Sequence, residues 1–287
     1  MTASIGALIR RDLPPAKVVE HARAVQEGFD ELWVIEDLPF AGGISQQAAV
    51  LAATDTAAVG LGIAPAPFRN PAALAMEWAT LDEIYPGRVI GGIGHGVQAW
   101  MQQIGERVSS PLTLLKETIL AVRQLLAGDL VKVEGRYVQL DGVQLEYPPN
   151  QAPKVLAGVT GPKSLLLSGA VADGTVLSEG HGPDDIKRAR HLVDLGREEA
   201  GRTAHHHITA FAGFYVGKMD NIGNENPDAD PSFTWDAVGE DADQVAAQLQ
   251  TLIAAGVDSL VLLPFGQDVT QQLQLAGETI VPQLVRA

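Results

Sequence analysis

The sequence contains no cysteine, few aromatic or basic residues, and no long apolar run. Without a cysteine among its 287 residues, it can form neither a disulfide framework nor a thiolate metal or redox centre. No apolar run approaches the roughly 20 residues that a membrane-spanning helix requires. The first residues also lack the basic segment and apolar stretch of a signal peptide, which predicts a cytoplasmic protein.

Basic residues are outnumbered by acidic ones. The chain has 20 Lys and Arg against 35 Asp and Glu, a formal net charge of −15. This balance argues against nucleic acid or an anionic membrane as a partner. A small anionic ligand is still allowed, because backbone amides and a few cations can bind a phosphate inside an acidic protein.

Eight short apolar segments alternate with amphipathic ones along the chain. The apolar segments lack polar alternation, as expected of parallel strands covered on both faces, and lie at residues 4–8, 32–35, 59–63, 89–93, 154–157, 175–177, 208–216 and 259–263. Helices are predicted at 16–26, 45–53, 71–85, 111–126, 183–200, 243–255 and 270–285. A further helix is predicted to follow the turn at 158–163 and to end at residue 170. The pattern predicts one α/β domain over 1–287, a (β/α)8 TIM barrel.

The chain departs from this pattern after the fourth predicted strand. We expect an insertion over about 97–150, in which a loop runs through Trp100 and residues 128–147 form a hairpin. A second loop is expected at 218–236, a stretch rich in Asn, Asp, Pro and Gly.

The fourth predicted strand is rich in glycine and leads to His95. Its glycines, at 91, 92, 94 and 96, would let a flat or bulky group approach the backbone closely. Residues 94–99 also match the dinucleotide fingerprint G-x-G-x-x-A. Trp100 and Met101 follow, no helix clearly begins there, and no convincing acidic partner ends a following parallel strand, so the context for a dinucleotide site is poor. His95 is either a proton or hydrogen-bond donor at the strand end, or a polar residue satisfied there.

The residues that follow the strands should meet at one rim of the barrel. Residues 158–163 form a strand-to-helix turn in which Thr160, Lys163 and free amides could hold a phosphate, although a plain tight turn is the simpler alternative. Glu36 and Asp37 could act as an acid/base pair, although adjacent side chains diverge in an extended chain, so that only one of them is expected to face the cavity. Candidates at the other strand ends are Ala64, Pro65, Gly94, Gly158, Ser178 and Phe265. Trp100 could cover a planar cofactor or line the substrate pocket together with Phe40 and Phe265.

Motifs for metal or hydrolytic chemistry are missing from the sequence. His205, His206 and His207 are consecutive, so they cannot converge on one ion, and we interpret them as a solvated turn on the opposite rim. There is no nucleophile elbow, zinc motif or Walker loop. The chemistry is therefore expected to come from a bound cofactor, with no metal site.

Several segments resemble the luciferase-like flavin-dependent oxidoreductases. Residues 29–37 are similar to the second strand of that family, and residues 61–71, 79–82 and 86–88 are similar to its third and fourth strands. Residues 158–163 with 172–174 resemble its deazaflavin-using branch, which includes methylene-tetrahydromethanopterin reductase and deazaflavin-type glucose-6-phosphate dehydrogenase. The similarity extends over about 5–178 and 256–264.

The resemblance implies a TIM barrel, often dimeric, with a flavin or deazaflavin at the carboxyl rim. The cofactor phosphate would lie against Thr160, Gly161, Pro162 and Lys163. The ring would lie near Glu36, Asp37, Ala64 and Pro65, with Gly94, His95, Gly158 and Ser178 also in contact. The family often has a cis peptide after the third strand, and the matching bond here is Ala64–Pro65.

Two departures from the family bear on the substrate. Relatives that act on glucose 6-phosphate carry a histidine where this chain has Asp37 and a catalytic glutamate where it has Val97, so this substrate is not expected. His95 is then the remaining candidate for the proton donor, with Asp37 and Glu36 as further catalytic candidates.

These observations predict an oxidoreductase that transfers hydride between coenzyme F420 and an organic substrate. One alternative is a reduced-FMN monooxygenase whose loops at 97–110 and 218–236 shelter a flavin peroxide. Another is a non-catalytic flavin-binding relative. The expected partners are a small-molecule substrate and a second copy in a homodimer.

Overall fold

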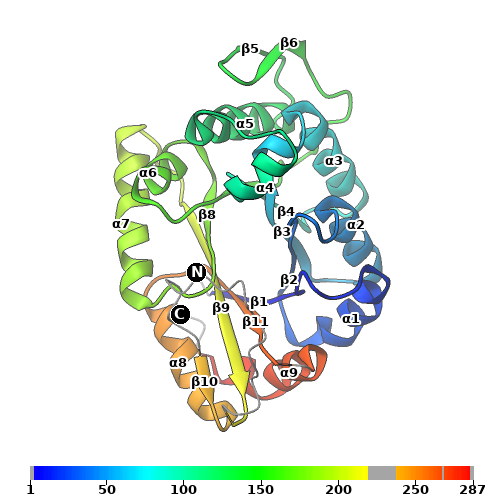
Figure 1. Cartoon of the computed structure of the whole chain (residues 1–287), viewed down its shortest axis with the longest axis vertical. Helices are drawn as coiled ribbons and strands as arrows, with labels where there is room; N and C mark the ends of the chain where they lie inside the picture. Colours follow the sequence, from blue (N-terminus) through cyan, green and yellow to red (C-terminus); the bar gives the residue numbers. More distant parts are fainter. Residues whose placement is uncertain (1–2, 219–236, 267, 285–287) are drawn as a thin grey trace.

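The computed structural model describes residues 3–218, 237–266 and 268–284 (Figure 1). The loop expected at 218–236 lies, apart from Lys218, outside the described residues. No helix in the described part of the chain is long and apolar enough to cross a membrane.

Eight parallel strands close into a barrel, which confirms the predicted (β/α)8 fold. Each strand pairs with its neighbours in the order β1–β2–β3–β4–β7–β8–β9–β11, and β11 pairs with β1. The strands are β1 (Ser4–Leu8), β2 (Glu31–Val34), β3 (Ala58–Pro65), β4 (Val89–Gly94), β7 (Lys154–Gly158), β8 (Gly174–Leu177), β9 (His207–Val216) and β11 (Ser259–Pro264). A short strand that was not predicted, β10 (Ala237–Gly239), pairs with β9 outside the closed barrel.

Helices form a ring around the strands (Figure 1). They are α1 (Val18–Val25), α2 (Gly43–Ala53), α3 (Pro71–Ile84), α5 (Pro111–Leu126), α6 (Pro162–Val171), α7 (Pro183–Glu199), α8 (Ala242–Ala254) and α9 (Val269–Leu275). Local sequence fixes where α3 begins: the Asn70 side chain accepts a hydrogen bond from the Ala72 amide at 2.9 Å, and Pro71 occupies the first helical position.

The segment expected as an insertion contains three different elements. Helix α5 packs against α3 and α6 and so belongs to the ring. The predicted hairpin is present as β5 (Val131–Glu134) and β6 (Gln139–Val143), antiparallel and outside the ring (Figure 1). Trp100 lies not in a loop but on a short helix, α4 (Gln98–Gln103), which we did not expect because its six residues carry too short a pattern.

Apolar side chains fill the barrel interior. Trp33 is fully buried, and its ring meets that of Phe211 edge-on with centroids 5.5 Å apart. Gly60 makes room for Trp33, because a Cβ at position 60 would lie 2.3 Å from its ring. The interior cluster comprises Leu8, Trp33, Leu156, Val176, Phe211 and Val261.

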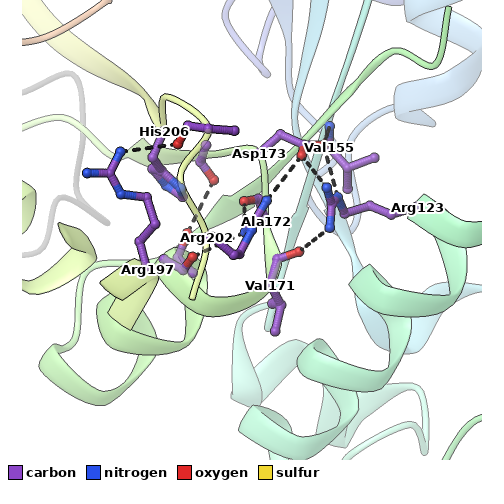
Figure 2. A network of polar contacts seen from close by, with 12 residues as sticks. Arg123, Val155, Val171, Ala172, Asp173, Arg197, Arg202 and His206 are labelled. Carbon is purple, nitrogen blue, oxygen red and sulfur yellow. Dashed lines mark hydrogen bonds and ion pairs between the residues drawn. The ribbon is translucent and has the colours of Figure 1, made fainter. Parts of the chain in front are cut away.

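A polar network covers the amino-terminal ends of β7, β8 and β9 (Figure 2). Asp173 accepts hydrogen bonds from Arg123 of α5, at 2.6 and 3.1 Å, and from the amide of Val155. Arg202 donates to the carbonyl of Ala172 and forms an ion pair with Asp173. These contacts join α5, α6 and the chain after α7 at one end of the barrel.

The three consecutive histidines lie on this amino-terminal rim, opposite the strand exits, but they are not a uniformly solvated turn. His205 is exposed and pairs with Asp258 at 2.7 Å. His206 is buried, and its Nε2 lies 2.9 Å from the hydroxyl of Thr175. The solvated-turn interpretation is wrong for His206 because closure of β9 onto β8 covers the residue just before β9. Within the described residues, no group of three His, Asp or Glu side chains is arranged to hold a metal ion.

Candidate functional site at the carboxyl rim of the barrel

All predicted site residues lie beyond the carboxyl ends of the strands or in the last residues of them. Because the barrel is closed and parallel, these ends share one rim. Side-chain contacts connect some neighbouring strand ends. Asp37 after β2 accepts a hydrogen bond from Arg11 after β1, and His95 after β4 contacts Ser164 at the start of α6. No contact joins Asp37 to His95 within the described residues.

The turn between β7 and α6 is open to solvent. Thr160, Gly161, Pro162 and Lys163 are all exposed, and a Cβ at position 161 would meet nothing within 4 Å. The side chains of Thr160 and Lys163 have no hydrogen-bond or ion-pair partner in the described part of the chain. The first amides of a helix lack intrahelical partners, and those of α6 after Pro162 belong to this exposed turn. A hydroxyl, an ammonium and free amides together form a donor set suited to a phosphate.

His95 is half-buried between β4 and α6. Its Nε2 lies 3.0 Å from the Ser164 hydroxyl, while Nδ1 is buried without a hydrogen-bond partner among the described residues. Burial lowers the pKa of His95, and the backbone of Pro111 acts weakly in the opposite direction. The ring is therefore neutral at pH 7. Ser164 was missed at the sequence level because a serine in a first helical turn is normally read only as a capping residue.

The glycines of β4 accommodate the chain's own side chains. A Cβ at Gly91 would lie 2.6 Å from Trp78, and Cβ atoms at Gly94 and Gly158 would lie 2.8 and 2.4 Å from Ile63. The flat or bulky groups that approach these glycines in the structure are therefore the chain's own Trp78 and Ile63. Ile63 is half-buried, so the wall between β3, β4 and β7 offers an aliphatic side chain instead.

The non-proline cis peptide lies two residues earlier than expected. It joins Gly62 to Ile63, and a second cis bond joins Leu38 to Pro39. The bond Ala64–Pro65 is not cis, and Pro65 is the last residue of β3, where it pairs with Gly94. The cis bond Gly62–Ile63 lies where the register between β3 and β4 shifts, between Leu61 and Ala64.

Glu36 and Asp37 are adjacent but have different partners. Glu36 is 4% exposed and accepts two hydrogen bonds from Arg69, at 2.7 and 2.8 Å, and one from the Gly43 amide. Both of its oxygens are engaged, so Glu36 holds α2 and the segment before α3 in place.

Asp37 lies nearer the surface of the rim. Its side chain is 25% exposed and accepts a hydrogen bond from Arg11 at 3.0 Å. Burial raises the pKa of Asp37, and Arg11 offsets only part of this rise. Arg11 also lies over the ring of Phe40, 5.1 Å from its centroid. Asp37 is thus a carboxyl group that retains a proton to higher pH than usual.

The remaining candidates lie on the same rim, with fewer contacts. Trp100 and Phe265 are half-buried, and Phe40 is 47% exposed. Ser178 follows β8, and its carbonyl lies 2.9 Å from Nδ1 of His181. Ala64 is buried at the end of β3.

Known proteins resemble the chain over most of its length. Residues 2–222 match the model of the family described as luciferase-like monooxygenase. A 5,10-methylenetetrahydromethanopterin reductase of Methanolobus tindarius is 32% identical over 207 residues, 71% of this chain and 63% of the relative's length. An F420-dependent glucose-6-phosphate dehydrogenase of Microbacterium testaceum is 27% identical over 91% of this chain and 90% of the relative.

A solved structure confirms the fold. An F420-dependent secondary alcohol dehydrogenase, in complex with an F420–acetone adduct, has a TM-score of 0.87 over 99% of both chains at 22% identity. The family match covers more than two thirds of the chain and includes the strand exits from β1 to β8. The chain therefore belongs to the luciferase-like monooxygenase family.

Proposed function

We propose that this protein is an oxidoreductase that binds coenzyme F420 at the carboxyl rim and transfers hydride between it and an organic substrate. The observation that carries the proposal is the exposed turn at 160–163, where Thr160 and Lys163 have no partner in the described part of the chain. The F420-dependent glucose-6-phosphate dehydrogenase among the relatives supports the choice of cofactor.

The residues present fit this cofactor. Thr160, Lys163 and the first amides of α6 would hold its phosphate, and the half-buried Ile63 offers an apolar surface for its ring. When bound, F420 would supply the redox chemistry through C5 of its ring, and the protein supplies position and polarity.

Asp37 is our candidate for the group that exchanges a proton with the substrate. A general acid must keep its proton near the working pH and reach the substrate. Asp37 has a partly exposed carboxyl at the rim, and burial shifts its pKa upward from the ordinary value, in the direction that a general acid requires, whereas both oxygens of Glu36 are engaged by Arg69. Trp100, Phe40 and Phe265 would line the substrate pocket.

Equilibrium titration with oxidised F420 and with FMN tests the choice of cofactor. We expect tight binding of F420 and weak binding of FMN. The reverse result would favour the reduced-FMN monooxygenase, and binding of neither would refute the cofactor site altogether. A non-catalytic relative would bind F420 but fail to reduce it with any of a panel of alcohols, aldehydes and sugar phosphates.

Lys163→Ala tests the phosphate assignment. The substitution removes the exposed ammonium group of Lys163 that would contact the cofactor phosphate, so F420 affinity should fall roughly three- to tenfold. Lys132→Ala is the matched control, because Lys132 lies on the outer hairpin and pairs with Asp141. Unchanged affinity in Lys163→Ala would exclude this side chain as a phosphate ligand.

We also propose that the chain forms a homodimer through the outer faces of α2 and α3, the helices that follow β2 and the next strand of the barrel, β3 (Figure 1). Helix α2 contains no charged residue, and α3 exposes Met76 and Ile84 at 59% and 60%. Exposed apolar residues on an almost uncharged face are typical of interfaces. Sedimentation should show a dimer that Met76→Glu converts to monomer.

A further inference from the structure

One hydrogen bond connects two strand exits of the proposed cofactor site. His95 and Ser164 are 69 positions apart in sequence, yet Nε2 and Oγ lie 3.0 Å from each other. His95 follows β4 directly, and Ser164 is the third residue of α6. The bond therefore ties the first turn of a helix to the end of a neighbouring barrel strand.

The imidazole is poorly placed to deliver a proton to a substrate. Nε2 is occupied by Ser164, and Nδ1 is buried with no hydrogen-bond partner in the described part of the chain. A general acid needs a protonated nitrogen within hydrogen-bond reach of the reacting group. Neither nitrogen meets this condition.

Few other hydrogen bonds hold the first turn of α6 within the described residues. Leu165 donates its amide to the carbonyl of Gly161 at 2.9 Å, which closes the turn. Pro162 and Lys163 are exposed and Ser164 is half-buried, and the side chains of Thr160 and Lys163 have no hydrogen-bond partner within the described residues. Since a phosphate is held by the direction of these amides, any contact that fixes the turn contributes to affinity.

We propose that His95 is a positioning residue: by holding Ser164, it fixes the first turn of α6 for the phosphate of the cofactor, and it does not donate the proton of the reaction. The proposal rests on the F420 site described above. It assigns Ser164 to that site as the residue through which His95 acts.

Amide hydrogen exchange in the cofactor-free protein tests the positioning directly. His95→Gln and Ser164→Ala should each speed exchange of the Leu165 amide about three- to tenfold, the effect of losing one ordinary hydrogen bond. Ser164→Thr keeps the hydroxyl and should restore slow exchange. His191→Gln, an exposed histidine on α7, is the matched control and should change nothing.

Cofactor affinity provides the second measurement. Both variants should weaken F420 binding by about three- to tenfold, and the double variant should be no weaker than either single one, because the two residues share one contact. Ser164→Thr should bind like the unchanged protein.

Nitrogen NMR shifts of the His95 ring at pH 7, with F420 bound, test whether the ring can be the donor. A neutral ring is expected, and a cationic ring would overturn the proposal. Exchange and affinity that stay within twofold in both variants would also overturn it. If the unchanged protein binds no F420 while exchange still speeds up, the proposed function fails but the positioning of the turn stands.

Discussion

At the scale of single residues, neighbours in sequence take different roles because their partners differ. Glu36 is closed into a buried pair with Arg69, while Asp37 meets Arg11 at the rim. Adjacent side chains in an extended segment point in different directions, so only one of two adjacent carboxylates can face the rim. The sequence suggested an acid/base pair, and the structure separates a structural carboxylate from a candidate catalytic one.

The first prediction concerns the buried pair. Arg69→Met should lower the free energy of unfolding by about 3 kcal/mol, because it leaves the Glu36 charge buried without its partner. Urea denaturation measures the change. Glu36→Gln combined with Arg69→Met should cost less than the sum of the two single changes, and full additivity would show that the pair does not act as a unit.

The second prediction concerns the protonation of Asp37. Burial raises its pKa and Arg11 lowers it, so Arg11→Met should raise the pKa of Asp37 further. Carbon NMR of the Asp37 carboxyl across a pH titration reports the midpoint. Arg10→Met is the control, because Arg10 pairs with Asp12 and should leave the midpoint unchanged. A fall in the midpoint on removing Arg11 would contradict the assignment.

At the scale of elements, one carboxylate anchors the outer hairpin. Glu117 of α5 accepts hydrogen bonds from the amides of Arg136, Tyr137 and Val138, at 2.8, 2.8 and 2.9 Å. Burial alone would raise the pKa of Glu117, but the three amide bonds outweigh it and the pKa lies below its ordinary value. The alternating sequence predicted the hairpin itself, whereas nothing local indicated what it packs against.

The third prediction is that Glu117→Gln loosens the hairpin without unfolding the barrel. An amide side chain has a single acceptor oxygen, so it cannot receive all three donors. Hydrogen exchange should speed up at Tyr137 and Val138 by at least about tenfold while exchange in the barrel strands is unchanged.

Because the pKa of Glu117 is lowered, the anchoring should be present above pH 4.5 and lost as the pH falls below it. Equal acceleration in the barrel strands would show that the hairpin and the barrel unfold together.

At the scale of the whole molecule, barrel closure covers two histidines that stay neutral to lower pH in the folded state than in the unfolded chain. Burial, together with Arg202 and Arg190, lowers the pKa of His206 to about 3, and burial together with Lys154 lowers that of His207 to about 4. In the unfolded chain both would titrate near their ordinary value of 6.5. Between pH 6.5 and these lowered values, the unfolded state binds more protons, so stability decreases as the pH falls.

The fourth prediction gives this effect a size. From pH 6.5 to 5, the free energy of unfolding should fall by up to about 1.4 kcal/mol per pH unit for each of the two histidines. His206→Gln should remove the contribution of His206 to this pH dependence of the free energy of unfolding, as measured by urea denaturation at several pH values. His191→Gln should keep the full slope, and an unchanged slope in His206→Gln would show that this residue is not the source.

The architecture of the barrel could be read from sequence because its signals are local. Uninterrupted apolar runs mark strands that are covered on both faces, and Asn70 with Pro71 marks the start of α3. Short elements carried too little signal: α4 and β10 were not expected, and the buried state of His206 follows only from the strand that closes over it.

The sequence by itself determined the eight strands, the helices between them, the family resemblance and the set of residues that follow each strand. Only the tertiary structure decided which of those residues meet. The contacts Arg11–Asp37, Arg69–Glu36 and His95–Ser164 join residues 26, 33 and 69 positions apart. Local patterns report whether a segment is covered by the core, but they do not report which side chains closure brings together around the rim, and those pairings set the charge and hydrogen bonding of the site.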